Sequence, residues 1–272
     1  MDLQKYLDRV GYSGPVAPDY PTLRALHVAH LLAVPFENLD IHAGRKITVG
    51  AEHAYKKIVG ERRGGFCYEQ NGLFGAVLTA IGFGVTYLSG RVARKSGGWG
   101  PEFDHLALLV EIPEDAPYLA DVGFGESFRE PLCWNDTAPQ AQEDREYRLS
   151  ETLEGRILSQ KLPGKDWEDP YILSTLPRQL EDFAGMAHYH QTSPESGFTK
   201  NPLISQALPG GRISLTDKLF IVTRQGERTE LPVTGVAAYF EKLEQEFGVN
   251  LLPELRQNLE GRVSPVTGEN ES

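Results

Sequence analysis

The sequence has few cysteines, no long apolar run and no long basic run. It contains 2 cysteines in 272 residues, Cys67 and Cys133, which are too few for a disulfide scaffold. Its apolar stretches are far shorter than a membrane-spanning helix, and its first residues lack the apolar core of a signal peptide. With 27 basic and 38 acidic side chains, its net charge is −11. These absences argue against membrane and nucleic-acid partners and favour a protein of the reducing cytoplasm.

Apolar spacing along the chain predicts helices first, then strands, then a mixed region. The length allows one large domain or two to three small ones, and 40% hydrophobic residues suffice for a real core. Consecutive strand-like runs without helices between them predict an antiparallel sheet or barrel, so the fold class is α+β. We expect helices over 3–10, 21–33, 51–59, 67–81 and 235–247, strands over 85–93, 105–112 and 118–122, and hairpins over 147–162 and 213–224.

One run carries the strongest chemical signal. Gly64 and Gly65 allow a tight turn that delivers Cys67 to the start of a predicted helix, where the helix dipole favours a thiolate. His105 opens an apolar strand 38 residues later, and Asp121 ends the next strand run after a further 16. A histidine that takes the thiol proton and a carboxylate that orients the histidine would complete a nucleophilic site.

Other interpretations of these residues stay open on residue type and spacing alone. Cys67 is equally well explained as a buried structural thiol, and a disulfide to Cys133 is possible. Seven histidines are available, so spacing alone does not select His105. Asp104 competes with Asp121 as the orienting carboxylate, but neighbouring strand residues point to opposite faces, so we expect Asp104 to face away from the His105 side.

Four islands in order resemble the arylamine N-acetyltransferase family. They are Arg63-Gly64-Gly65-Phe66-Cys67-Tyr68-Glu69-Gln70-Asn71, Pro35-Phe36-Glu37-Asn38-Leu39, Asp104-His105-Leu106 and Asp121-Val122-Gly123-Phe124-Gly125. The resemblance is strong over the first half of the chain and weak over the rest. It implies a helical bundle over 1–82, a β-barrel over 83–190 and an α/β lid over 191–272, with a core like that of cysteine proteases and transglutaminases.

The resemblance also implies an activity. It is acetyl transfer from acetyl-CoA, through a thioester on Cys67, to arylamines, arylhydrazines or arylhydroxylamines, with no metal. Cysteine hydrolases or transglutaminase-like enzymes that act on amides or peptides would share the same three residues, and a non-enzymatic binding module is a further alternative. The sequence does not indicate an oligomeric state.

Residue roles follow from the resemblance in the same way. Cys67, His105 and Asp121 would be catalytic, and Phe36 and Phe124 would line the acceptor pocket. The family's coenzyme A site lies beside the loop that contains Gly123 and Gly125, whose N–H groups can approach a phosphate or thioester oxygen. An ordinary strand-ending turn would explain the same glycines.

Three supporting segments have smaller expected roles. We expect Glu37 to pair with Arg63, and residues 68–71 to support the first helical turn without a chemical role. The polar loop 192–198 resembles the family segment that closes over the cleft, although the flanking histidines His188 and His190 are unexpected there. Two histidines at this spacing could suggest a metal, but no third ligand is near in the sequence, so a solvated loop is expected.

Overall fold

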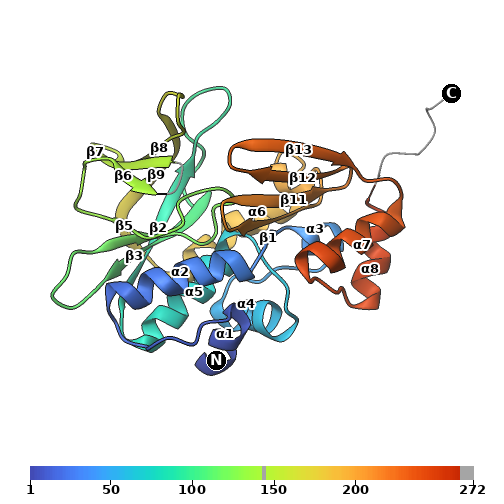
Figure 1. The fold of residues 1–272 in the computed structure, drawn as a ribbon, viewed down its shortest axis with the longest axis horizontal. Helices are drawn as coiled ribbons and strands as arrows, with labels where there is room; N and C mark the ends of the chain where they lie inside the picture. The colour runs from blue at the N-terminus through green and yellow to red at the C-terminus, as the bar shows by residue number, and fades with distance from the viewer. Residues whose placement is uncertain (143–144, 264–272) are drawn as a thin grey trace.

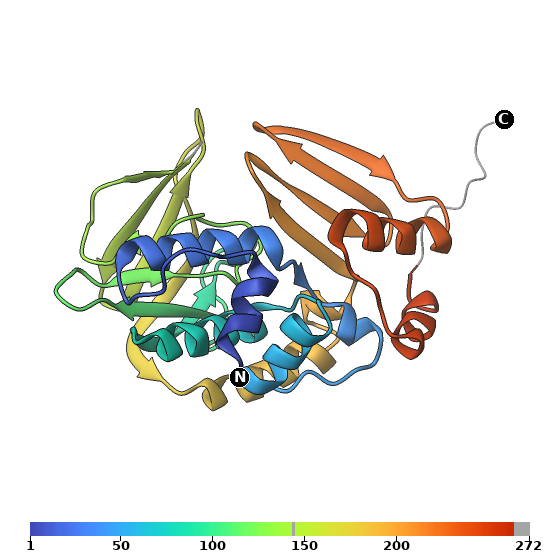
Figure 2. The same cartoon turned by 60° about the horizontal axis from the view of Figure 1, so that its bottom comes forward.

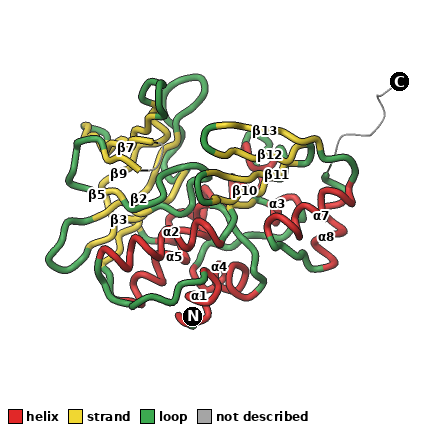
Figure 3. Tube along the Cα trace, in the orientation of Figure 1, coloured by secondary structure: helices red, strands yellow, loops and turns green. Residues whose placement is uncertain are grey.

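A computed structural model describes residues 1–142 and 145–263. Their strands form two separate sheets, and helices pack beside both of them (Figure 1). In Figure 2 the barrel strands lie on the left and the strands of the second sheet lie on the right, and helices of the N-terminal region cross the middle and lower part of the view. The strands therefore fall into two groups, with helices beside and between them (Figure 3). No helix in the described part of the chain is long and apolar enough to cross a membrane.

Most of the N-terminal helices begin and end at the expected signals. The Asp19 side chain accepts the N–H of Thr22 at the start of the second helix, and Gly11 and Gly82 close the first and fifth in the left-handed conformation. The third predicted helix continues beyond residue 55 as a π-helical turn. The elements are α1 (Leu3–Val10), α2 (Tyr20–Ala33), α3 (Leu39–His42), α4 (Ala51–Tyr55), η1 (Lys56–Gly60) and α5 (Cys67–Ile81).

Eight antiparallel strands form a nearly closed barrel in the order β5-β4-β3-β2-β9-β8-β7-β6. Its apolar interior is built from alternate residues of these strands, such as Leu119 and Leu158. The side chain of Gln140 links the two edge strands, β5 and β6. It accepts the N–H of Cys133 at Oε1 and donates from Nε2 to the carbonyl of Cys133. The strands are β2 (Gly84–Val92), β3 (His105–Glu111), β4 (Tyr118–Ala120), β5 (Leu132–Cys133), β6 (Gln140–Gln142), β7 (Arg145–Thr152), β8 (Gly155–Lys161) and β9 (Glu168–Arg178).

The second sheet combines the C-terminal strands with one short strand from the N-terminal region, in the order β1-β10-β11-β12-β13. In β1, Phe36 lies opposite Ser205 of β10. Helices α7 and α8, together with α3, pack their apolar residues against this sheet. The elements are β1 (Phe36–Glu37), β10 (Leu203–Leu208), β11 (Gly211–Thr216), β12 (Leu219–Arg224), β13 (Glu227–Pro232), α7 (Val236–Phe247) and α8 (Pro253–Glu260).

Three helical segments connect the barrel to the second sheet. They are η2 (Leu180–Phe183), α6 (Ala184–Thr192) and η3 (Gly197–Thr199). Phe183 and Ala187 pack into the same core as the N-terminal helices. The α+β class and the order of helices, barrel and mixed region are confirmed. The proposed boundaries at 82/83 and 190/191 stay a prediction, and residues 264–272 of the last proposed part lie outside the described residues.

Candidate active site

Two glycines place Cys67 at the start of α5. A Cβ atom on Gly64 would lie 1.9 Å from the carbonyl oxygen of Pro35, and one on Gly65 would lie 2.7 Å from the Cβ of Glu69. Side chains larger than hydrogen therefore cannot occupy these positions without displacing the backbone of β1 or the first turn of α5. Cys67 is the first residue of α5 and is 3% exposed. Its thiol thus stands at the positive end of the helix dipole.

A buried ionic cluster supports this glycine segment. Arg63 donates from Nε to Glu37 Oε1 and from Nη2 to Asp40 Oδ1, both at 2.9 Å. Lys57 donates from Nζ to Glu69 Oε1 at 2.9 Å and lies 3.0 Å from Asp40 Oδ2. All five side chains are buried, and removing one partner from such a cluster costs about 3–5 kcal/mol. The expected pair of Glu37 and Arg63 is confirmed, and it holds the segment before Cys67 in place.

His105 and Asp121 form a buried ion pair. His105 opens β3, Asp121 directly follows β4, and His105 Nε2 lies 2.7 Å from Asp121 Oδ2. Burial alone would lower the pKa of His105, but the Asp121 carboxylate outweighs burial and raises that pKa to about 10. Burial would raise the pKa of Asp121, but the His105 contact and further hydrogen bonds hold it below its usual range. The pair is therefore an imidazolium and a carboxylate at neutral pH.

The Cys67 thiol acts on the charge of the His105 imidazole. A hydrogen bond with Cys67 contributes to the raised pKa of His105. Because Nε2 faces Asp121, Nδ1 is the ring nitrogen left for the thiol. Gly123 packs against the same point, since a Cβ atom on it would lie 2.7 Å from the Cα of Cys67. The structure thus brings Cys67, His105 and Asp121 together, as the sequence predicted.

Three side chains that the sequence analysis did not identify also bind Asp121. Its Oδ1 accepts from Asn71 Nδ2 at 2.8 Å, its Oδ2 accepts from the Tyr171 hydroxyl at 2.9 Å, and its backbone N–H donates to His27 Nε2 at 3.0 Å. Burial lowers the pKa of His27 to about 4, so this imidazole is neutral and can accept. The carboxylate is therefore fixed by residues of the N-terminal helices and of β9 as well as by His105.

Asn71 corrects the expectation that residues 68–71 support only the first helical turn. Its Nδ2 also donates to the carbonyl of Leu106 at 2.6 Å, and its Oδ1 accepts the N–H of Val122 at 2.9 Å. One side chain thus ties the helix of the nucleophile to both strands that carry the predicted histidine and aspartate. An amide on an otherwise apolar helix face is the sequence signal that could have indicated this role.

The two glycines in the loop after Asp121 have different surroundings, because Gly123 is tightly packed and Gly125 is not. The N–H of Gly123 donates to Asp121 Oδ1 at 3.0 Å, so this donor is already engaged within the protein. The need for glycine at position 123 is explained by its close packing on Cys67 and Asn71. A Cβ atom on Gly125 would meet nothing within 4 Å, and Gly125 borders a narrow gap that Phe36 also lines. Coenzyme A contacts by Gly123 and Gly125 stay a prediction.

Two phenylalanines lie near the predicted catalytic residues, Phe124 against His105 and Phe36 beside Gly65. The ring of Phe124 meets the His105 ring edge-on at a centroid distance of 5.0 Å. Phe36 forms an isolated bridge with Gly65, and its ring lies 6.0 Å from that of Phe198. Both phenylalanines are partly exposed, so each can offer apolar area beside the nucleophile.

The competing carboxylate has a different partner. Asp104 Oδ1 lies 3.1 Å from Nε2 of His190, and Nδ1 of His190 lies 3.2 Å from the Ser196 hydroxyl. The contact of His105 with Asp121 rather than Asp104 is confirmed. His190 belongs to α6 and is buried, whereas a solvated loop was expected around it. In residues 1–142 and 145–263, no group of three or more His, Cys, Asp or Glu side chains could hold a metal ion.

Comparisons with known proteins agree with these motifs. A family profile described as N-acetyltransferase matches residues 19–256. The arylamine N-acetyltransferase of Mycolicibacterium smegmatis is 34% identical over 271 residues, which is 98% of each chain. That of Escherichia coli (strain K12) is 34% identical over 92% of this chain and 89% of the relative.

Solved structures extend the likeness to the fold. The structure of Mycobacterium marinum arylamine N-acetyltransferase in complex with CoA matches with a TM-score of 0.89 at 33% identity, over 96% of this chain and 98% of that one. The enzyme from Salmonella typhimurium matches with a TM-score of 0.87 at 32% identity, over 95% and 98%. The chain therefore belongs to the arylamine N-acetyltransferase family and is an acyltransferase.

Proposed function

We propose that the protein transfers an acetyl group from acetyl-CoA to aromatic amines, hydrazines or hydroxylamines through a thioester on Cys67. The observation that carries this proposal is the contact of Cys67 with His105, which is itself paired with the buried carboxylate of Asp121. The CoA complex of the Mycobacterium marinum relative supports the choice of donor. Membership of the family favours transfer over the cysteine-hydrolase alternative.

The first half-reaction acylates the protein. The Cys67 thiolate attacks the thioester carbonyl of acetyl-CoA, and the carbon–sulfur bond to coenzyme A breaks. The departing thiolate takes the proton of the His105 imidazolium, so free coenzyme A leaves as a thiol. Asp121 keeps His105 in the orientation and protonation state that this proton transfer requires.

The second half-reaction transfers the acetyl group to the acceptor. The amine nitrogen attacks the Cys67 thioester, His105 takes the proton that the nitrogen loses, and the Cys67 thiolate leaves. Phe36 and Phe124 would hold the aromatic ring beside the thioester, because Phe124 contacts His105 and Phe36 pairs with Gly65, two residues before Cys67. The first half-reaction requires a Cys67 that is not held in a disulfide, and both cysteines are free in the structure. A reducing compartment such as the cytoplasm is the proposed location.

The decisive experiment is to incubate the protein with acetyl-CoA in the absence of any amine and to measure its intact mass. We expect a gain of one acetyl group, located on Cys67 by peptide mapping. Later addition of an aniline should remove this group and produce the acetylated aniline. Double-reciprocal plots at several fixed acceptor concentrations should give parallel lines.

Two cysteine variants make the assignment specific. Cys67→Ser should not acquire the acetyl group, whereas Cys133→Ser should acquire it at the normal rate, because Cys133 lies on β5 away from His105. Absence of acetylation in the unmodified protein, or acetylation of Cys133 alone, would refute the proposal. Release of acetate without transfer to any amine would favour a hydrolase.

A further inference from the structure

The segment 121–129 follows β4 and carries two groups of the proposed site. Its first residue is Asp121, and its Phe124 packs against the His105 ring at a centroid distance of 5.0 Å. The ladders that β4 forms with β3 and β5 reach no further than Ala120, one residue before this segment. Asp121 is nevertheless buried. Its backbone N–H therefore needs a partner from outside the sheet.

His27 of α2 bonds both ends of this segment. Its Nε2 accepts the N–H of Asp121 at 3.0 Å, and its Nδ1 lies 2.7 Å from the carbonyl oxygen of Arg129. Because a carbonyl oxygen can only accept, Nδ1 carries the proton and Nε2 carries the lone pair. One neutral imidazole, in one tautomer, thus closes the segment 121–129 into a loop.

The imidazole of His27 is held in place by its surroundings. The side chain is fully buried, its ring stacks on Phe128 at a centroid distance of 5.6 Å, and it meets Phe74 edge-on at 5.9 Å. Burial lowers the pKa of His27 to about 4, although the carboxylates of Asp121 and Glu130 act in the opposite direction. The neutral form that the two hydrogen bonds require is therefore the form present at neutral pH.

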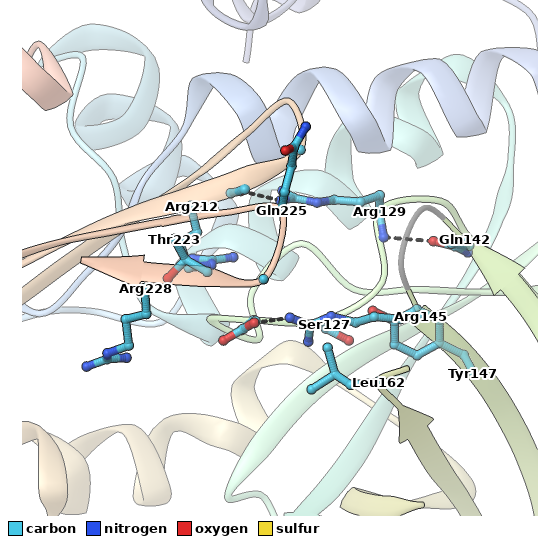
Figure 4. A pocket seen from close by; sticks show the side chains of 14 residues that line it. Ser127, Arg129, Gln142, Arg145, Tyr147, Leu162, Arg212, Thr223, Gln225 and Arg228 are labelled. Carbon is cyan, nitrogen blue, oxygen red and sulfur yellow. Dashed lines mark hydrogen bonds and ion pairs between the residues drawn. The ribbon is translucent and has the colours of Figure 1, made fainter. Parts of the chain in front are cut away.

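The far end of the loop is fixed to the barrel. Arg129 and Glu130 both donate their backbone N–H groups to Oε1 of Gln142 at 2.9 Å, and Figure 4 shows the contact of Arg129 with Gln142. Nε2 of Gln142 donates in turn to the carbonyl of Glu130 at 2.7 Å. The imidazole of His27 therefore has a fixed support on one side from which it can hold Asp121 on the other.

We propose that His27 is a positioning residue, whose Nε2 holds the backbone of Asp121 so that the carboxylate points at His105. The proposal rests on the proposed function, because it assigns a role in that reaction. Asp121 Oδ2 lies 2.7 Å from His105 Nε2, and a misplacement of about 1 Å in such a site can slow a reaction about 100-fold. Without His27, the buried N–H of Asp121 would favour a shift of the backbone toward another acceptor.

Two substitutions of His27 separate its two hydrogen bonds. The amide of glutamine reaches the position of Nε2, so His27→Gln can still accept the Asp121 N–H but loses the bond to Arg129. The shorter amide of asparagine reaches the position of Nδ1, so His27→Asn can still donate to the Arg129 carbonyl but leaves the Asp121 N–H unpaired. Each variant leaves one buried backbone group without its partner, so both should lower the melting temperature by a similar amount. Each is therefore the matched control of the other.

We expect His27→Asn to slow acetylation of Cys67 at saturating acetyl-CoA about 10- to 100-fold, and His27→Gln to retain the rate within about threefold. The rates are measured by rapid quenching and intact-mass analysis. The acetyl-CoA concentration that gives half of the maximal rate should stay the same in both variants, because the buried His27 side chain cannot touch the donor.

The pKa of His105 gives a second measurement, which packing alone would not change. The Asp121 carboxylate raises this pKa from 6.5 to about 10. In an NMR titration it should fall from about 10 toward 6.5 in His27→Asn and stay near 10 in His27→Gln, because only the first variant releases the Asp121 backbone.

Equal rates in the two variants would overturn the inference. So would a slow His27→Asn variant in which the pKa of His105 is unchanged, since His27 would then serve packing alone. If His27→Asn does not fold, NMR of the unmodified protein with isotopically labelled histidine decides: we expect a coupling between His27 Nε2 and the Asp121 N–H, and a proton on Nε2 would contradict it. Failure of the unmodified protein to be acetylated by acetyl-CoA would instead refute the proposed function.

Discussion

Replacement of Asp121 by asparagine keeps the shape of the side chain and removes its charge. Asp121 Oδ1 accepts from Asn71 and from the Gly123 N–H, and Oδ2 accepts from His105 and Tyr171. Asparagine has one acceptor oxygen and one NH2 group in place of the two oxygens. The amide must therefore turn its NH2 group toward one of these two pairs of donors.

The structure indicates that the NH2 group will face His105 and Tyr171. The Gly123 N–H cannot become an acceptor, and a buried donor left unpaired costs about 1–3 kcal/mol. The Tyr171 hydroxyl can rotate, and the imidazole can accept at Nε2 if its proton moves to Nδ1. A proton on Nδ1 then faces Cys67, so His105 can no longer take the thiol proton.

We expect Asp121→Asn to slow acetylation of Cys67 by acetyl-CoA about 10⁴-fold, which corresponds to about 5 kcal/mol of activation free energy. The rate is measured by rapid quenching and intact-mass analysis at saturating acetyl-CoA. Thermal unfolding and near-ultraviolet circular dichroism establish that the variant is folded.

Asp104→Asn is the matched control, because Asp104 contacts His190 rather than His105. It should retain acetylation within about tenfold, a loss of at most about 1.4 kcal/mol in activation free energy. A folded Asp121→Asn variant that is acetylated within tenfold of the normal rate would refute the tautomer argument. If Asp104→Asn were the impaired variant, the orienting carboxylate would have been misidentified.

Three further predictions concern packing, specificity and pH. Gly123→Ala should destabilise the fold by about 1–3 kcal/mol and slow acetylation, because the new methyl group would lie 2.7 Å from the nucleophile's Cα; an unchanged melting temperature and rate would contradict the packing argument. Phe36→Ala and Phe124→Ala should each change the ranking of aniline acceptors by about 1–3 kcal/mol while acetylation by acetyl-CoA alone continues. Loss of that acetylation with an unchanged ranking would remove both residues from the acceptor pocket. The pKa of His105 is raised from 6.5 to about 10, so the folded protein retains a proton that the unfolded chain releases in this interval. The free energy of unfolding should therefore fall as pH rises from 6.5 to about 10, by up to about 1.4 kcal/mol per pH unit, and urea titrations should show a weaker decline for Asp121→Asn.

The predicted catalytic residues could be identified because four short motifs resemble a known family, and some of the signals in these motifs are local. Two glycines before Cys67 mark a backbone in close contact with a neighbour, and the spacing of apolar residues marks the helix that follows. The predicted helix over 67–81 coincides with α5, and the hairpin predicted over 147–162 is formed by β7 and β8. The resemblance selected Asp121, and the need of a buried acidic residue for a partner is consistent with that choice.

The remaining parts of the site depend on contacts between distant segments. Tyr171 and His27 contact Asp121 from positions 50 and 94 residues away, and no local pattern in the sequence distinguishes them from other buried aromatic residues. A cavity lined by Arg129, Arg145 and Arg212 is assembled in the same way, from the barrel on one side and β11 on the other (Figure 4). Arg212 looks like any basic residue of an alternating strand until the facing wall is known.

The two-residue strand β1 has a consequence for the order in which the molecule is made. Phe36 and Glu37 leave the ribosome early, but their partners Ser205 and Ile204 are synthesised near the end of the chain. The Asn38 side chain also lacks its partners until then, since it binds the backbone of Asn201 and Leu203. The nascent chain therefore carries an unpaired edge, next to the segment that precedes Cys67, until β10 has been synthesised. The surroundings of Cys67 can reach their final arrangement only after β1 has paired with β10.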